Sequence, residues 1–268
     1  MNDLIFRQVR ILDGSGGEEL IGDVSVREGR INEVGTVTEG LAPSGREIIA
    51  DGAVLCPGLI DTHAHDDGAF FRHPGMQFKL SQGVTTVVSG NCGFSAIPAD
   101  PTKDSVAASG GILAGLEGEF TDLDGYYAAA LSRQPAINNM MLVGHNTVRS
   151  LVMGDSKSAP SDLQLQEMQR HVTHAMEQGA CGFSSGLIYR PGRYSDTAEV
   201  TELAKMGPVE DRMAVVDAMG RCHGLEQLVV ADASIMPSVP RANTNLTCFM
   251  IGERIGEWVR TQPASYGL

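Results

Sequence analysis

The 268-residue sequence is poor in aromatic and in basic residues. Aromatic side chains make up 5% of it, with a single Trp, and 20 Lys and Arg residues face 33 Asp and Glu residues, for a net charge of -13. A surface of this sign repels phosphate backbones and anionic lipids, so we expect neither a nucleic-acid partner nor a membrane partner. The sequence also lacks an apolar run of the roughly 18 residues that a membrane span needs.

Cysteine is scarce as well, and no secretory leader is evident. The N-terminal residues carry an acidic side chain early and never develop an apolar stretch, so we expect a cytoplasmic protein. An odd number of widely spaced cysteines argues against a disulfide framework. The five are Cys56, Cys92, Cys181, Cys222 and Cys248. Because 42% of the residues are apolar and 20% are charged, the chain can form a buried core.

The pattern of apolar residues predicts three segments. Residues 1–57 alternate as short strands separated by turns, which indicates a small β unit. Residues 58–205 alternate strands with helices, which is typical of a parallel α/β fold. The strands are expected at 59–65, 84–91, 139–145 and 180–186, and a helix over 161–179 with a capping box formed by Ser161 and Gln164. Residues 206–268 differ in character and end in an apolar helix over 246–260.

Two histidines stand at the end of the first of these α/β strands. His63 and His65 are two positions apart, so within a strand both side chains would point to the same side. The carboxyl ends of barrel strands are where active sites form, and two imidazoles converging there suit zinc. The alternative is a pair of polar residues at a strand end without any metal.

Cys92 follows the second of these strands and would lie beside the histidines. A thiolate next to two imidazoles is a ligand set for zinc, and Gly90 and Gly93 permit tight turns around it. The alternative for Cys92 is a small buried residue. Among the other histidines, His145 also ends a strand and is a candidate further ligand, whereas His171 and His174 are expected on the solvated face of the 161–179 helix.

Together these residues resemble a family. The run VLCPGLIDTHAHDD at 54–67 resembles the first metal motif of the amidohydrolase superfamily, and SQGVTTVVSGNCG at 81–93 resembles the N-acyl-D-amino-acid deacylases, also called D-aminoacylases. The runs VGHNTVR at 143–149 and FSSGLIYRPGRY at 183–194 are similar to later blocks of these enzymes. The resemblance covers residues 1–205.

The resemblance implies a zinc-dependent hydrolase that cleaves the amide bond of a small N-acyl-D-amino acid. The implied fold is a β-sandwich, here residues 1–57, beside the first half of a (β/α)8 barrel, here residues 58–205. By likeness His63, His65 and Cys92 are metal ligands and Tyr189 lies in the substrate region. The family's two later metal-binding histidines and its acid/base aspartate have no counterpart, because the pattern stops after Lys205. We therefore expect an incomplete, inactive site.

The segment 206–268 resembles a different class, the C-terminal end of the glucose-methanol-choline (GMC) flavin oxidoreductases. The likeness rests on VVD at 215–217, HGL at 223–225, VADASIMP at 230–237 and ANTN at 242–245. It implies an α+β segment in which Asp232 lies near an FAD and Asn243 matches one member of the catalytic pair. The glycine-rich phosphate loop of an FAD site is lacking: in the nearest run, which starts at Gly14, Glu19 stands in place of the third glycine.

The sequence thus indicates a chimeric chain with its joint near Lys205 and Met206. Three readings follow: a zinc amidohydrolase, a fragment of an FAD-dependent oxidoreductase that acts on CH-OH donors, and a chain without catalytic activity and with little stable fold. Metal content, flavin content and amide hydrolysis distinguish them.

Overall fold

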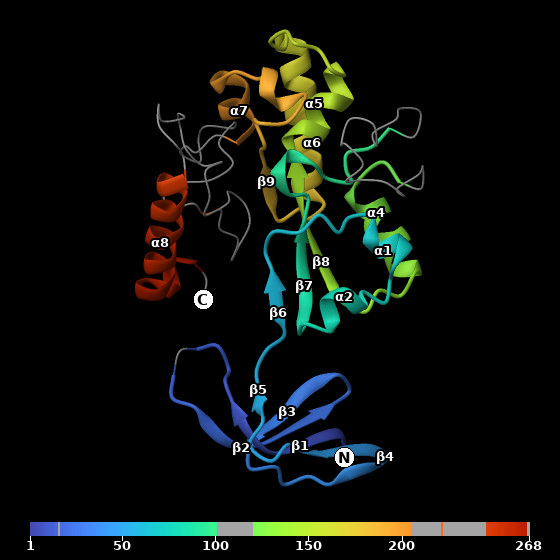
Figure 1. Ribbon diagram of the computed structural model, residues 1–268, viewed down its shortest axis with the longest axis vertical. Coiled ribbons are helices and arrows are strands. Elements are labelled where there is room, and N and C mark those ends of the chain that lie inside the picture. The colour runs from blue at the N-terminus through green and yellow to red at the C-terminus, as the bar shows by residue number, and fades with distance from the viewer. Residues whose placement is uncertain (16, 101–119, 205–220, 222–244, 267–268) are drawn as a thin grey trace. The chain divides into compact units, whose positions relative to one another are not determined.

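The computed structural model describes residues 1–15, 17–100, 120–204, 221 and 245–266 (Figure 1). The chain forms two compact units, Met1–Leu59 and Ile60–Leu268. Within the described residues, no helix has the length and apolar character required to span a bilayer.

The first unit is built on one five-stranded mixed sheet. Its strands are β1 (Asn2–Ile11), β2 (Leu20–Arg27), β3 (Arg30–Gly35), β4 (Leu41–Ile49) and β5 (Val54–Leu55). The order is β3-β2-β1-β4, and β5 also pairs with β1. Strands β1, β2 and β3 pair antiparallel, whereas β4 and β5 run parallel to β1. A second sheet that would complete a sandwich stays a prediction.

The turn expected between the second and third strands is confirmed. Glu28 and Gly29 connect β2 to β3 with φ angles of 51° and 73°. Two successive left-handed residues match the twist of the flanking strands in a two-residue hairpin. The buried apolar residues of this unit include Ile5, Val9 and Val24.

The second unit contains a curled sheet of four strands in sequence order, β6-β7-β8-β9 (Figure 1). They are β6 (Leu59–Asp61), β7 (Val84–Ser89), β8 (Asn138–Gly144) and β9 (Gly182–Ser184). Strands β7, β8 and β9 pair parallel. This order and direction, with helices between the strands, confirm the parallel α/β prediction and form half of a barrel wall.

Helices lie between the strands and after the last of them. They are α1 (Ala69–Arg72), α2 (Gln77–Leu80), α4 (Leu123–Ser132), α5 (His145–Met153), α6 (Asp162–Glu177) and α7 (Thr197–Ala204), with 3-10 turns η1 (Asn91–Gly93) and η2 (Gly192–Tyr194). The core that this part of the unit shares with the sheet includes Phe70, Val87, Tyr126, Met141, Val148, Met168, Phe183 and Leu203. Helix α8 (Asn245–Thr261) and the 3-10 turn η4 (Pro263–Tyr266) follow later in the chain.

Helix α6 begins as its sequence predicts. The Ser161 side chain accepts a hydrogen bond from the Gln164 backbone, and Gln164 reaches back to Ser161, which completes the capping box. The apolar face of the helix is buried at Met168, Val172 and Ala175.

Candidate metal centre

The two histidines follow strand β6 and do not belong to it. Strand β6 ends at Asp61, so the expectation that the strand extends to His65, with its period aligning both side chains, was wrong. The chain turns after Asp61, because Oδ1 of Asp61 accepts a hydrogen bond from the His63 amide at 3.1 Å. Between the histidines, the Ala64 amide donates to the Val88 carbonyl at 3.0 Å and anchors the segment to β7. The two imidazole rings nevertheless lie close, with centroids 5.6 Å apart.

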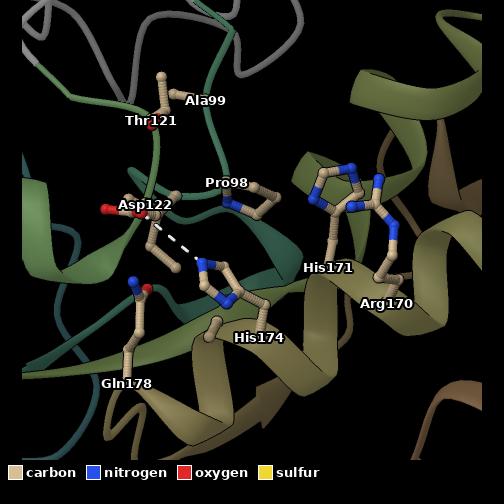
Figure 2. A pocket seen from close by; sticks show the side chains of 10 residues that line it. Pro98, Ala99, Thr121, Asp122, Arg170, His171, His174 and Gln178 are labelled. Atoms are coloured by element: carbon tan, nitrogen blue, oxygen red, sulfur yellow. Dashed lines mark ion pairs between the residues drawn. The ribbon is translucent and has the colours of Figure 1, made fainter.

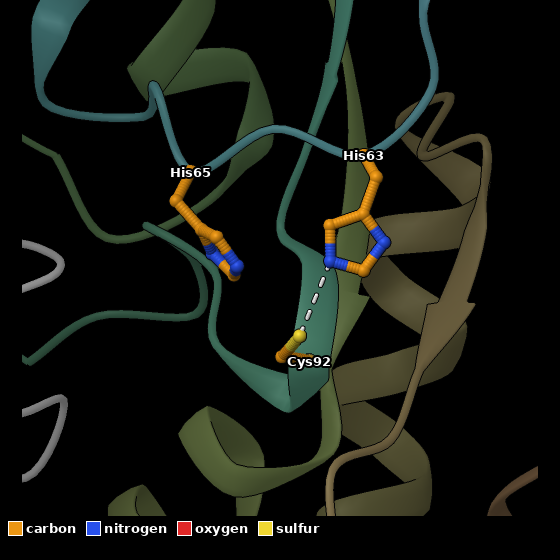
Figure 3. Close-up of side chains that lie close together, drawn as sticks. All are labelled: His63, His65 and Cys92. Atoms are coloured by element: carbon orange, nitrogen blue, oxygen red, sulfur yellow. Dashed lines mark hydrogen bonds between the residues drawn. The ribbon is translucent and has the colours of Figure 1, made fainter.

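Cys92 lies in the loop that follows β7, in a backbone conformation unusual for a residue with a side chain. Its φ and ψ are 56° and 23°, in the left-handed region, and Gly90 and Gly93 on either side both have φ of 81°. This turn directs Sγ toward His63, whose Nε2 lies 3.3 Å away (Figure 3). The ligand atoms of His63, His65 and Cys92 all lie within 4.8 Å of one another.

These donors fit a zinc ion. Tetrahedral zinc with two nitrogen ligands and one sulfur ligand holds its ligand atoms about 3.3–3.8 Å apart, given bonds of roughly 2.0–2.3 Å. The His63–Cys92 separation is already in this range, and small side-chain rotations close the others. Nδ1 of His65 is buried and has no hydrogen-bond partner within the described structure. A buried imidazole nitrogen without a partner is costly, and a metal ion bound at that nitrogen would satisfy it.

Charges around the three ligands are paired with one another. Lys79 forms ion pairs with Asp61 at 2.6 Å and with Asp66 at 2.9 Å. Burial lowers the pKa of Lys79, but the hydrogen bonds to Asp61 and Asp66 raise it more, so that its net pKa lies above the usual value. Lys79 therefore stays charged and neutralises both carboxylates beside the histidines.

Burial acts on two of the ligands directly. It lowers the pKa of His65, and the neighbouring His63 lowers it further. Burial also raises the pKa of the Cys92 thiol. The imidazole is thus held in the neutral form that binds metals, whereas the thiol must lose a proton when a metal binds.

Comparison with known proteins assigns the larger part of this structure. The chain is 40% identical over 204 residues to N-acyl-D-glutamate deacylase of Alcaligenes xylosoxydans xylosoxydans, a match that covers 76% of this chain and 41% of that enzyme. Its structure matches the N-acyl-D-glutamate deacylase of Bordetella bronchiseptica, solved with zinc and a phosphonate inhibitor, with a TM-score of 0.67 and 41% identity over 76% of this chain and 42% of that chain. The homologues of this chain are N-acyl-D-amino-acid deacylases. The chain spans well under half the length of these two deacylases.

A second likeness confirms the chimeric resemblance. Residues 190–252 match the family model described as GMC oxidoreductase. A stretch of 60 residues is 55% identical to the oxygen-dependent choline dehydrogenase of Escherichia coli and covers 22% of this chain and 10% of that enzyme. The model match begins inside the segment with the deacylase resemblance, so the position of the joint stays a prediction. Asp232 and Asn243, predicted for the GMC site, lie outside the described residues.

His145, the candidate further ligand, contacts Glu199 in the second unit. It begins α5, is completely buried, and its Nε2 lies 2.9 Å from Oε1 of Glu199. The other oxygen of Glu199 pairs with Arg149, which is also fully buried. Within the described structure His145 does not join the metal-ligand group. Glu199 thus joins α7 to α5 through two buried side-chain contacts.

Tyr189 lies near the cysteine loop, and its substrate role stays a prediction. Its side chain is 45% exposed. Its ring packs edge-on against that of Phe94, two residues after Cys92, with centroids 5.6 Å apart.

A pocket of about 200 Å³ lies elsewhere, along α6 (Figure 2). Its lining includes Asp122, Arg170, His171 and His174. His174 is 55% exposed and lies 3.6 Å from Asp122, whereas His171 is 23% exposed and lies 3.3 Å from Glu167, so the expected solvation holds for His174 and only in part for His171. Burial lowers the pKa of His171. The pocket contains none of the predicted metal ligands.

The supporting residues around the candidate ligands were not predicted from the sequence. Asp67 and Asn146 lie inside the runs 54–67 and 143–149, but no role was predicted for either, and Lys79 belongs to no such run. Asp67 is fully buried and accepts hydrogen bonds from the amides of Ala96 and Gly90, which flank the cysteine turn. Burial raises its pKa to about 6. Nothing in the sequence showed that the side chains of Asp67 and Asn146 would bond to the loop around Cys92.

Proposed function

We propose that His63, His65 and Cys92 bind one zinc ion, and that the reaction served by this centre is hydrolysis of the amide bond of an N-acyl-D-amino acid. The observation that carries the proposal is the convergence of two imidazoles and a thiol from two separate loops at the carboxyl edge of the sheet. The homologous deacylases, one of them solved with zinc, support the same chemistry.

Bound zinc would lower the pKa of a coordinated water to about 7 and would polarise the scissile carbonyl. The residues of this chain prepare the centre for that chemistry. His65 is kept neutral by burial, and Lys79 holds the carboxylates of Asp61 and Asp66 away from the ligand atoms. Tyr189 borders the cysteine loop, where its exposed ring can contact the acyl or amino-acid part of a substrate.

The described centre provides three ligands and no acid/base carboxylate. Among the described residues, no Asp or Glu oxygen joins the group of ligand atoms, and His145 is paired with Glu199. A hydrolase needs a positioned acid or base to manage protons, a contribution of about 10²- to 10⁴-fold. We therefore expect metal binding with negligible turnover.

Two measurements test these statements separately. Elemental analysis of the purified protein should find one zinc per chain, lost in His63→Ala and Cys92→Ser but retained in Cys56→Ser, an exposed thiol in the other unit. Absence of zinc from the wild type after zinc loading would overturn the metal centre. Hydrolysis of N-acetyl-D-glutamate and N-acetyl-D-methionine should stay at background. Zinc-dependent turnover would show that the chain completes the site.

The oxidoreductase reading finds no FAD site in the described residues. The glycine-rich run beginning at Gly14 lies in the loop between β1 and β2, which pair antiparallel. A dinucleotide site needs such a run between a strand and a helix, where the helix N-terminus meets the pyrophosphate. We therefore assign no flavin chemistry to the residues that the structure describes.

A further inference from the structure

One buried amide side chain connects the loops around the cysteine ligand. Asn146, the second residue of α5, is 0% exposed. Its Nδ2 donates to the carbonyl of Cys92 at 3.1 Å and to the carbonyl of Gly186 at 3.2 Å. Its Oδ1 accepts from the amide of Gly192 at 2.6 Å. The side chain thus links the loops that follow β7 and β9 and the turn η2.

Glycines leave the space that this amide occupies. A Cβ atom at Gly93 or at Gly192 would collide with the carboxamide of Asn146. A Cβ atom at Gly186 would collide with the carbonyl of Cys92. The connection after β7 and the connection after β9 therefore approach the Asn146–Cys92 contact more closely than residues with side chains would allow.

The backbone of Cys92 needs such support. A residue with a Cβ atom is unfavourable at φ 56° and ψ 23°, and it persists there only where the surroundings fix it. The hydrogen bond from Asn146 fixes the carbonyl of this residue, which sets the peptide plane and with it the direction of the side chain. In that orientation Sγ faces His63.

We propose that Asn146 is a positioning residue of the metal centre, which holds Cys92 in the left-handed conformation that turns its thiolate toward His63 and His65. The proposal rests on the metal centre of the proposed function. Asn146 touches no ligand atom itself and acts through the backbone of Cys92. An amide is required, because only an amide has two donors for the two carbonyls and an acceptor for the Gly192 amide.

The isosteric variant Asn146→Asp tests the proposal. A carboxylate at this position has no proton for either carbonyl and faces both oxygens with a negative charge, so the loop must move. The matched control is Asn139→Asp, because Asn139 also bonds through its side chain, to Ser89 and Tyr126, but makes no bond to the cysteine turn.

The probe is Co²⁺, titrated into metal-free protein while the thiolate-to-cobalt absorption band is recorded. Circular dichroism of each variant checks the fold. Wild type and Asn139→Asp should show the band with equal amplitude. Asn146→Asp should retain the fold, lose most of the band and bind Co²⁺ about 10- to 100-fold more weakly, as is typical when a supporting partner of a metal ligand is removed.

The outcomes separate the two proposals. If the wild type shows no thiolate band, the metal centre fails and the role of Asn146 fails with it. If the wild type shows the band and Asn146→Asp shows it unchanged, only the role of Asn146 is overturned. Should Asn146→Asp not fold, Asn146→Ser takes its place, because it is neutral and too short to reach both carbonyls. An unchanged band in Asn146→Ser overturns the role equally.

Discussion

Sγ of Cys92 and Nε2 of His63 lie 3.3 Å apart, although 29 positions separate the two residues in the sequence. Nothing local brings them together: each follows a different strand, and only the pairing of β6 with β7 places the two loops side by side. The donor set is therefore a product of the folded sheet. A metal ion that binds this set must favour the folded state over the unfolded chain.

Zinc is accordingly expected to stabilise the protein against heat. A ligand at 100 times its dissociation constant adds about 2.7 kcal/mol to the free energy of unfolding, so the melting midpoint should rise measurably when zinc is added to metal-free protein. Differential scanning fluorimetry of the wild type and of His65→Ala checks this expectation. The variant lacks one ligand and should show little shift. An equal shift in both would place the zinc effect at another site.

The free energy of unfolding should depend more on a buried side chain of α6 than on an exposed one. Met168 is fully buried against the shared core, so Met168→Ala should lower the free energy of unfolding by about 2–5 kcal/mol. Leu163 lies on the same helix but is 78% exposed, so Leu163→Ala should change the stability by less than about 0.5 kcal/mol. Urea unfolding followed by circular dichroism measures both. Equal effects would contradict the packing of α6.

The sequence predicted what depends on local pattern. The period of apolar residues placed α6, and Ser161 with Gln164 marked its start, because caps and amphipathic faces act within a few residues. The histidines were chosen by residue type and by their place at the end of an expected strand, and the cysteine by its place after the next one. The reason offered for the histidines was wrong, since β6 ends at Asp61 and the turn made by Asp61 sets their directions.

The residues that support the centre could not be found in this way. Asn146 and Cys92 are 54 positions apart, and nothing in the sequence states that an amide and a carbonyl will meet across two loops. The partial burial of His171 was missed for the same reason, because its helix face is polar by pattern while the residue also lines the pocket along α6. Long-range packing decides such contacts, whereas the periodicity of apolar residues predicts only which face of a helix is apolar.

Flavin should be absent from the purified protein despite the GMC likeness of residues 190–252. The described glycine-rich run connects two antiparallel strands and provides no helix N-terminus for a pyrophosphate. The visible absorption spectrum of the protein, after incubation with FAD and gel filtration, checks this. A flavin band that co-elutes with the chain in stoichiometric amount would favour the oxidoreductase reading.

Removing the charge of Glu199 is expected to lower the free energy of unfolding strongly. It lies fully buried between His145 and Arg149. Glu199→Gln leaves the guanidinium buried without its partner, which costs about 3–5 kcal/mol in comparable cases. The control is Glu167→Gln, because Glu167 pairs with an Arg170 that is 68% exposed, and exposed pairs contribute about 0–1 kcal/mol. Urea unfolding at neutral pH compares the two variants.

The same carboxylate gives the stability a predictable dependence on pH. Burial raises the pKa of Glu199, but the hydrogen bonds from His145 and Arg149 lower it more, so its net pKa in the folded state lies below the usual 4.5. A carboxyl group with a depressed folded pKa contributes stability that is complete above the unfolded pKa and is lost as the pH falls through the folded pKa. The gap in unfolding free energy between wild type and Glu199→Gln should therefore be constant from about pH 7 to about pH 5.5 and shrink below pH 4.5. Glu199→Gln also removes the carboxylate partner of His145, so the difference reports Glu199 together with the side chains that bond to it. A gap that stays constant down to pH 3.5 or widens on acidification would show that Glu199 is not held as a buried anion.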